Sequence, residues 1–365
     1  MAETVMPVPA FLVLRCVRGL GPVGARRLVT SAGSAPAAIA SLPAAEQEAA
    51  HRRARQVGAA CADRDIEIIT WGSPGYPGAI EALEDAPLCL FARGNSARLG
   101  TPSVAIVGTR DASAYGGRVT RRLVAGLVEG GVTVVSGLAR GIDTIAHRAA
   151  LEAGGFTVAV LGTGVDVCYP RTNERTYREI AAHGAVVSEV LPGTPARPGA
   201  FPRRNRLVAA LADVTVVVEA GARSGALITA QCSAALGRPI AAVPGPVDAA
   251  SSDGSNALLR DGAHVVTGAE DVLAVLDLTA RGRTRVSRRS RATPCAEASP
   301  AEFDVLAAVA RTPARADDLV DATGRPVSEV VAALAALELR GTIEVDPGGY
   351  IHAVRPQPAP EGRRA

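Results

Sequence analysis

The chain has 365 residues, more than one domain usually holds, and its net charge of +3 does not by itself identify a partner. All 39 basic residues are arginines, whose planar guanidinium groups bind phosphate through two nitrogens and stack on bases. The six cysteines lack CxxC or CxxH spacing, which argues against a zinc site and a disulfide framework. No stretch is long and apolar enough to span a bilayer. We therefore expect a cytoplasmic protein without membrane contact.

The N-terminal region, residues 1–95, is predicted to form a small helical domain. Its apolar run Phe11–Leu14 is followed by a glycine-rich stretch, Gly19–Leu28, with the sequence GLGPVGARRL. This pattern fits a SAM or helix-hairpin-helix-like domain, in which amides at a helix N-terminus bind a phosphate. It fits a plain helical turn equally well.

Residues 96–278 alternate apolar, β-branched runs with helical patterns, which predicts an α/β domain with a doubly wound, Rossmann-like parallel sheet. Because the runs are continuously hydrophobic, we expect helices to cover both faces of the sheet. The predicted strands are Val104–Val107, Val132–Val135, Thr157–Leu161, Ala185–Val187, Val214–Val218, Ile240–Val243 and His264–Val266.

Three further segments are predicted beyond this domain. Residues 279–300 form an arginine-rich linker, which serves as a solvated tether or adds non-specific phosphate contacts. Residues 301–356 show three helical patterns and a hairpin, Gly341–Val345 with Tyr350–Val354, which predicts a winged-helix domain, and residues 357–365 are predicted to be a disordered tail. The third helical pattern, which begins at Ser328, contains no arginine, so we expect this domain to contact protein rather than to read DNA.

The carboxyl ends of the predicted strands carry the residues from which we infer binding, because ligands lie there in open α/β sheets. Glycines, small hydroxyls and arginines follow the first two strands, as Gly108-Thr109-Arg110 and as SGLARGID over residues 136–143. Glycine lets backbone amides approach a ligand and arginine favours an anion, so the pattern predicts phosphate binding. GxGxxG does not follow the first strand and GxxxxGK[ST] is missing from the sequence, so no cofactor is predicted.

The same strand ends offer little for catalysis, and we do not expect an enzyme. Glu189 and Glu219 follow strands, where they are expected to accept hydrogen bonds from backbone or arginine groups. His147 lies one helical turn after Asp143, and a structural hydrogen bond between the two is expected to fix the start of that helix.

Seven motifs together resemble, in their order, those of the DprA family of DNA-processing proteins, also called Smf. They lie within residues 104–266 and read IVGTRDASAYG, SGLARGIDTIAH, LGTGVDVCYP, SE, FPRRNRLVAAL, VVVEAGARSGALITA and VPGP. The preceding stretch is similar too, with Tyr76-Pro77 and Asp85–Leu88. The winged helix matches a C-terminal module that many members carry.

The resemblance implies a non-catalytic protein that binds single-stranded DNA and loads the RecA recombinase onto it during natural transformation. It also implies a homodimer, whose surface we expect near Asn256–Val266. The family's single-strand site uses the arginine of a G-S/T-R motif, here Arg110, an aromatic residue, here Phe201, and a lysine at the position of Pro198, so that the adjacent Arg197 is the expected substitute.

The expected mechanism combines phosphate binding with stacking. Arg110 binds a phosphate seated among the amides of residues 108–110 and 136–141, and Phe201 stacks on a base. The candidate DNA-binding residues are Gly108, Thr109, Arg110, Ser136, Gly137, Arg140, Gly141, Arg197, Phe201, Arg203, Arg204, Asn205 and Arg206.

Three alternatives stay open. Similar sheets bind small nucleotides as sensors, or cleave the N-glycosidic bond of nucleoside monophosphates. Those hydrolases carry PGGxGTxxE where this chain has EAGARSGALITA. A winged-helix transcription factor is the third alternative, and the acidic third helix argues against it.

Overall fold

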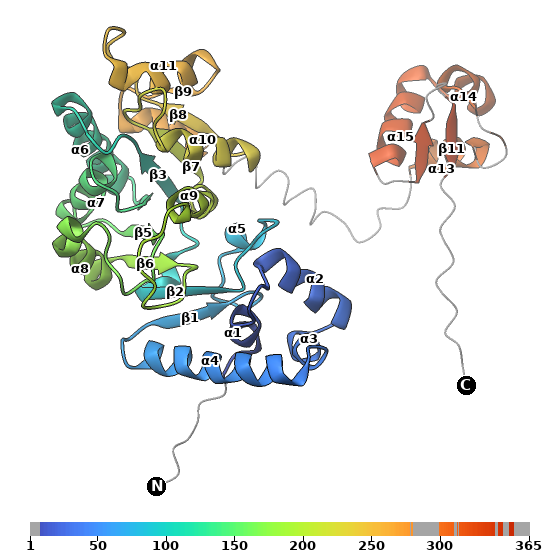
Figure 1. Ribbon diagram of the computed structural model, residues 1–365. Helices are drawn as coiled ribbons and strands as arrows, with labels where there is room; N and C mark the ends of the chain where they lie inside the picture. Colours follow the sequence, from blue (N-terminus) through green and yellow to red (C-terminus); the bar gives the residue numbers. More distant parts are fainter. Residues whose placement is uncertain are drawn as a thin grey trace. The chain divides into compact units, whose positions relative to one another are not determined.

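A computed structural model describes residues 8–277, 279, 299–309, 312, 314–339, 342–345 and 350–353. The chain forms two compact units that divide after residue 283 (Figure 1). The predicted tail at 357–365 and most of the predicted linker at 279–300 lie outside the described residues.

The first unit contains a nine-stranded sheet within the part of the chain described, in the order β1-β2-β6-β5-β4-β3-β7-β8-β9. Strands β3 to β9 pair in parallel, which confirms the predicted Rossmann-like core, whereas β2 pairs antiparallel with β1 and with β6. The strands are β1 (Glu67–Thr70), β2 (Cys89–Gly94), β3 (Ser103–Val107), β4 (Thr133–Ser136), β5 (Thr157–Leu161), β6 (Ala185–Ser188), β7 (Val214–Val217), β8 (Ile240–Ala242) and β9 (His264–Val265).

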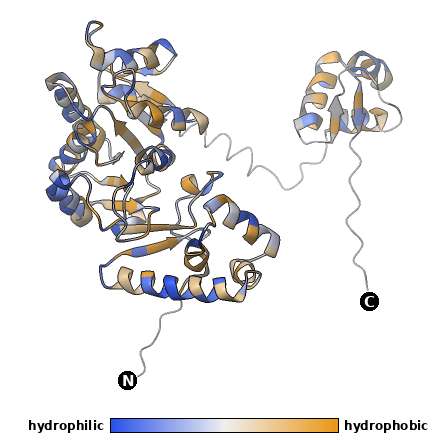
Figure 2. Ribbon diagram, viewed as in Figure 1, coloured by the Kyte–Doolittle hydropathy of each residue, from blue (hydrophilic) through white to orange (hydrophobic). Residues whose placement is uncertain are grey.

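Helices cover both faces of this sheet, because side chains alternate between the two sides of each buried strand. Ala105 and Val107 of β3 pack with α9 and α10, while Val104 and Ile106 pack with α6, α7 and a helix over residues 269–277. Figure 2 shows that strands of this sheet are largely hydrophobic. The helices are α6 (Ala114–Glu129), α7 (Ile142–Glu152), α8 (Glu174–His183), α9 (Ala200–Leu211), α10 (Ala226–Ala235) and α11 (Asp253–Arg260), with short 3-10 turns at Ser96–Arg98, Arg171–Asn173 and Ala250–Ser252.

The N-terminal region differs from the helical domain predicted over residues 1–95. Its first part is helical, with α1 (Ala10–Arg15), α2 (Pro22–Ala32), α3 (Ala35–Ala40) and α4 (Ala44–Ala62). The short helix α5 (Gly78–Glu81) and the strands β1 and β2 follow, and both strands belong to the sheet. The physical reason is the pairing of β2 with β6. Without it, β6 would be an exposed edge of the sheet.

A single tryptophan lies where the N-terminal helices meet the sheet. Trp71 packs against both hydrophobic clusters of this region, and its ring makes an edge-on contact with Phe11 at a centroid distance of 5.5 Å. The guanidinium of Arg26 in α2 lies 5.0 Å from the centre of the indole ring. The indole therefore joins α1 and α2 to the segment that follows β1.

The second unit is a winged helix, as predicted. Its helices are α13 (Pro300–Val309), α14 (Ala316–Thr323) and α15 (Val327–Leu339), and β10 (Ile343–Val345) pairs antiparallel with β11 (Ile351–Ala353). Val305, Leu319, Val330 and Ile351 contribute to its core.

Candidate nucleic-acid interface

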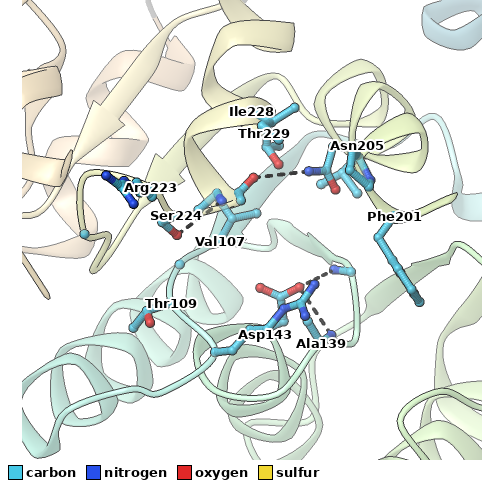
Figure 3. Close-up of a pocket in the computed structure, with 18 of the residues that line it drawn as sticks. Val107, Thr109, Ala139, Asp143, Phe201, Asn205, Arg223, Ser224, Ile228 and Thr229 are labelled. Carbon is cyan, nitrogen blue, oxygen red and sulfur yellow. Dashed lines mark hydrogen bonds between the residues drawn. The ribbon is translucent and has the colours of Figure 1, made fainter. Parts of the chain in front are cut away.

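The carboxyl ends of β3, β4 and β7 surround a pocket of about 490 Å³, which we call the strand-end pocket (Figure 3). Its walls come from residues 108–111, the start of α7, the start of α9 and residues 221–229. The structure thus brings together seven of the predicted residues, namely Gly108, Thr109, Arg110, Gly137, Phe201, Arg204 and Asn205.

The glycines beside the pocket are explained by packing. A side chain at Gly108 would meet Ile142 Cγ1 at 2.6 Å and the backbone oxygen of Glu219 at 2.9 Å, so α7 can approach β3 only because this residue is glycine. Gly141 has a φ of +76°, which disfavours other residues. Glycine at these two positions therefore needs no ligand to account for it.

The predicted seat for a phosphate among backbone amides is wrong for two amides of the 136–141 loop, because a carboxylate already accepts their hydrogen bonds. Asp143 Oδ2 accepts hydrogen bonds from the amides of Gly137 at 3.1 Å and Ala139 at 3.4 Å. The Thr109 amide donates to the carbonyl of Glu219 at 2.7 Å. Ser136 is fully buried and its hydroxyl donates to the Ile106 carbonyl at 2.7 Å.

The expected hydrogen bond between Asp143 and His147 is also wrong. The Nδ1 atom of His147 lies 2.7 Å from the hydroxyl of Thr157, and Asp143 instead holds the 136–139 loop. Burial, with a smaller contribution from Arg204, lowers the pKa of His147 to about 3. The ring is therefore neutral at physiological pH.

Arg204 is a buried structural cation rather than a surface contact to DNA. It is 5 % exposed, its guanidinium lies against Gly137, and it donates a hydrogen bond to the Val160 carbonyl. Burial lowers the pKa of Arg204 to about 10, which the Asp143 carboxylate partly opposes. The Arg204 guanidinium and the Asp143 carboxylate are both buried, and their opposite charges compensate each other.

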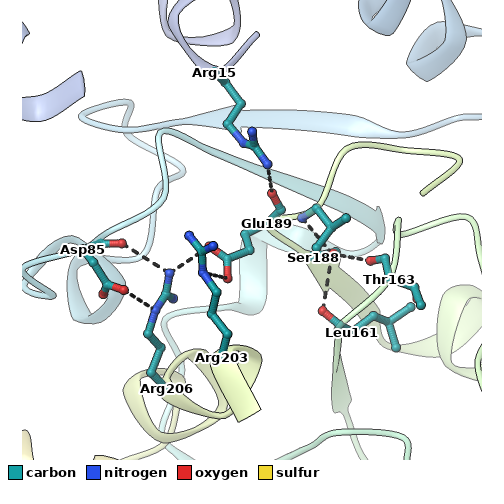
Figure 4. A network of polar contacts seen from close by, with 9 residues as sticks. Arg15, Asp85, Leu161, Thr163, Ser188, Glu189, Arg203 and Arg206 are labelled. Carbon is teal, nitrogen blue, oxygen red and sulfur yellow. Dashed lines mark hydrogen bonds and ion pairs between the residues drawn. The ribbon is translucent and has the colours of Figure 1, made fainter. Parts of the chain in front are cut away.

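Arg206 is occupied as well, by two carboxylates (Figure 4). Its Nε atom donates to Asp85 at 2.7 Å and its Nη2 atom to Glu189 at 2.8 Å. Arg206 thus links the N-terminal region to the end of β6. As expected, Glu189 accepts a hydrogen bond from an arginine, and Glu219 accepts two from Ser113, each at 3.0 Å.

Four predicted arginines are exposed, namely Arg110, Arg140, Arg197 and Arg203. Arg110 has no ion-pair partner among the residues described. Arg140 pairs with Asp111 at 3.1 Å, with both side chains largely in solvent, where such pairs contribute little. Arg203 is 3.8 Å from Glu189 and 59 % exposed, and it lines a second pocket together with Arg197.

Phe201 belongs to an aromatic pair that the sequence prediction missed. Its ring centre lies 5.2 Å from that of Tyr169, at an interplanar angle of 31°, and Tyr169 is 47 % exposed. Asn205 Nδ2 donates to the Gly225 carbonyl at 3.2 Å on the opposite wall of the pocket (Figure 3). The position of Tyr169 beyond the end of β5 was a signal that could have identified it.

Comparison with families of known proteins gives two matches. Residues 67–277 match the family model "DNA recombination-mediator protein A", and residues 289–349 match "DprA winged helix domain". Protein Smf of Escherichia coli K12 is 38 % identical over 290 residues, which cover 79 % of this chain and 78 % of Smf. The putative DNA processing protein DprA of Mycobacterium tuberculosis is 44 % identical over 269 residues, which cover 73 % of this chain and 68 % of that protein.

Solved structures give the same result. DprA of Streptococcus pneumoniae matches with a TM-score of 0.64 and 34 % identity, over 74 % of this chain and 98 % of that one. A Helicobacter pylori DNA processing protein A, solved for its single-stranded DNA binding mode, matches with a TM-score of 0.53 and 31 % identity, over 59 % of this chain and 97 % of that one. Within the described residues, none of the helices is both long and apolar enough to cross a membrane. This chain belongs to the DprA/Smf family of DNA recombination-mediator proteins.

Proposed function

We propose that this protein binds single-stranded DNA without sequence preference and without catalysis. The observation that carries the proposal is that Arg110, an exposed arginine without an ion-pair partner among the described residues, lines the strand-end pocket together with Phe201. The ring of Tyr169, which is 47 % exposed, lies beside that of Phe201. Cations that bind phosphates and aromatic faces that stack on bases are the two devices of sequence-tolerant single-strand binding. The single-stranded DNA binding of the Helicobacter pylori relative supports the same assignment.

The phosphate contact rests on side chains rather than on the 136–141 loop. The amides of Gly137 and Ala139 are taken by Asp143, so Arg110 provides the charge, with Arg223 on the far wall of the pocket. Phe201 and Tyr169 provide the stacking surface.

Fluorescence anisotropy with labelled oligo-dT and a matched duplex, over a salt series, tests this proposal. Arg110→Ala is expected to weaken binding to the single strand roughly 10-fold or more and to lower the salt slope by about 0.7. Arg175→Ala serves as the control, because Arg175 is also exposed but lies on α8, away from the pocket. Equal affinity of wild type and Arg110→Ala would contradict the assignment of the pocket.

The partners follow from the same proposal. The protein acts in the cytoplasm in natural transformation, as a homodimer that loads RecA onto the bound strand. Its membership of the DNA recombination-mediator family supports this role. Stimulation of RecA ATP hydrolysis on single strands coated with a single-strand-binding protein is the direct assay.

The winged helix has an accessory role in this proposal. Val327 and Val331 of α15 are 61 % and 54 % exposed, the exposed Glu329 and Glu338 are acidic, and the helix contains no arginine, so its outer surface is apolar and acidic where a DNA-reading helix presents basic or neutral polar groups. The duplex titration bears on this role, since a DNA-reading winged helix would give tight duplex binding.

Two enzymatic or sensory alternatives predict different results. A nucleotide sensor would bind a mononucleotide tightly, and an N-glycosidic hydrolase would release free base. Neither result is expected, because Asp111 and Asp143 line the strand-end pocket beside its arginines and leave it with little net charge for a small, highly charged ligand.

A further inference from the structure

We propose that a second pocket, between the N-terminal helices and the sheet, binds the backbone phosphates of the same DNA strand. The proposal rests on the proposed function and extends the binding path to α1 and α4. This pocket, the arginine pocket, has a volume of about 520 Å³. Its basic residues are Arg15 of α1, Arg53 of α4, Arg197 of the loop before α9, and Arg203 and Arg204 of α9.

The charge of the arginine pocket is poorly compensated. Glu189 is the one acidic residue among those that line it, and this carboxylate already accepts a hydrogen bond from Arg206 at 2.8 Å. Within the described part of the chain, Arg15, Arg53 and Arg197 have no ion-pair partner. By contrast, the strand-end pocket contains two carboxylates among its charged residues.

Folding brings these cations together from segments far apart in the sequence. Arg15 and Arg53 lie more than a hundred positions before Arg197, yet all three line one cavity. The Nη2 atom of Arg15 reaches the backbone oxygen of Glu189 at 3.4 Å, which directs this side chain toward the end of β6 (Figure 4). A cleft lined by one sign of charge concentrates counter-ions, so an anion is the ligand it favours.

The two pockets are neighbours on either side of the start of α9. Arg204 lines both of them, Phe201 lines the strand-end pocket, and the preceding Ala200 lines the arginine pocket. A side chain at Gly162, which lines the arginine pocket, would meet the Phe201 ring at 3.0 Å. A base stacked on Phe201 therefore has one pocket on each side, and the two phosphates that flank it are directed toward different arginines.

The start of α2 forms a further part of the wall of the arginine pocket. Gly21 and Pro22, at the start of α2, line the arginine pocket, so the stretch that fits a helix-hairpin-helix lies at the cavity. Residues before 67 lie outside the matched family model, so this contribution belongs to the N-terminal helices of this chain. A polyanion with regularly spaced phosphates, such as a DNA strand, fits two adjacent cationic pockets better than a single small anion does.

The test compares two double variants on the same helical region. Arg15→Ala/Arg53→Ala removes two cations of the arginine pocket. Arg18→Ala/Arg52→Ala removes the two other arginines of a neighbouring cavity that Arg53 also lines, and therefore controls for the loss of charge in that cavity. Anisotropy is measured with oligo-dT of roughly 4 to 16 nucleotides over a salt series. We expect the first variant to bind the longest strands at least fivefold more weakly, with a salt slope lower by about 1.4, or about 0.7 for each phosphate that an arginine no longer neutralises.

The shortest strands, which fill the strand-end pocket alone, are expected to bind the first variant as they bind wild type. The second variant is expected to match wild type at all lengths. Because Arg15 is half-buried, Arg53→Ala alone, at an exposed position, is expected to give part of the same loss.

Two outcomes overturn the inference. If Arg15→Ala/Arg53→Ala binds every length as wild type does while Arg110→Ala is impaired, the second subsite is wrong and the proposed function stands. If the loss is the same for the shortest and the longest strands, the arginine pocket is not a separate subsite. Failure of wild type to bind any strand would contradict the proposed function itself.

Discussion

At the residue scale, the arginines of one short motif lie in different environments and have different roles. In FPRRNR, Arg203 is exposed, Arg204 is buried beside Asp143, and Arg206 is held between Asp85 and Glu189. The three arginine side chains are chemically identical. They differ in the fold through their positions relative to the carboxylates of Asp85, Asp143 and Glu189. Removing one partner of a buried pair of opposite charges leaves the charge of the other uncompensated. The main role of Arg204 and Arg206 is therefore to stabilise the fold rather than to bind a ligand.

His147 should make the stability of the first unit sensitive to acid. Its pKa is about 3 in the fold, well below the ordinary value of 6.5, because burial disfavours the charged ring. Below pH 6.5 the unfolded chain therefore binds a proton that the folded chain does not. The free energy of unfolding should fall by about 1.4 kcal/mol per pH unit from this residue between about pH 6 and pH 4.

Thermal unfolding of wild type and His147→Gln at several pH values measures this effect. The midpoint of wild type should drop more between about pH 7 and pH 5 than the midpoint of the variant. His183→Gln is the control, because His183 is exposed at the end of α8, outside the surface expected for the homodimer. Parallel curves for wild type and His147→Gln would show that the buried ring does not contribute.

At the element scale, the approach of α7 to β3 determines the shape of the strand-end pocket. Gly108 allows contact with Ile142, Gly141 adopts a left-handed conformation, and Asp143 ties the 136–139 loop to the helix start. These contacts hold the loop that carries Arg110 against the start of α7.

Gly108→Ala tests this packing. The added methyl group would overlap the buried side chain of Ile142, and we expect a loss of about 1–3 kcal/mol in the free energy of unfolding. Gly58→Ala is the matched control, since Gly58 lies within α4 with no atom near the added group, and alanine should stabilise that helix by about 0.5–1 kcal/mol. Urea unfolding measures both, and equal stabilities of the two variants would contradict the packing argument.

Much of this fold could be predicted because the core strands are continuous apolar runs. Strands β3 to β9 come within a residue or two of the predicted bounds. Strand β1, with the sequence EIIT, and β2, with CLFARG, were missed because β2 joins the sheet by pairing with β6, a distant segment, and β1 joins it by pairing with β2. The same limit applies to the site, since nothing local indicates that Asp143 fills the loop 136–139. The position of Tyr169 after β5 pointed to the site, but its contact with Phe201 joins two distant segments.

At the scale of the whole molecule, the sheet has one apolar edge. Among the described residues, strand β9 pairs with β8 alone; His264 and Val265 are both exposed, and Val265 is 55 % exposed. An edge strand with an exposed apolar side chain is a template for association with a second copy. This edge lies within the surface expected for the homodimer, Asn256–Val266.

Val265→Glu is therefore expected to shift the protein toward monomer, because the introduced carboxylates would be desolvated in a shared interface. Light scattering coupled to size-exclusion chromatography measures the mass of each species. Val23→Glu is the control, since Val23 is an exposed valine on α2, far along the sheet from β9. A dimer that persists in Val265→Glu would place the contact elsewhere.

The position of Trp71 gives this protein an intrinsic optical reporter. It is the only tryptophan in the chain, and its indole touches Phe11 and Arg26 where α1 and α2 meet the sheet. Its emission spectrum and its quenching by a neutral quencher therefore respond to one event, the separation of the N-terminal helices from the sheet. No label is needed to observe whether those helices stay docked while a DNA strand binds.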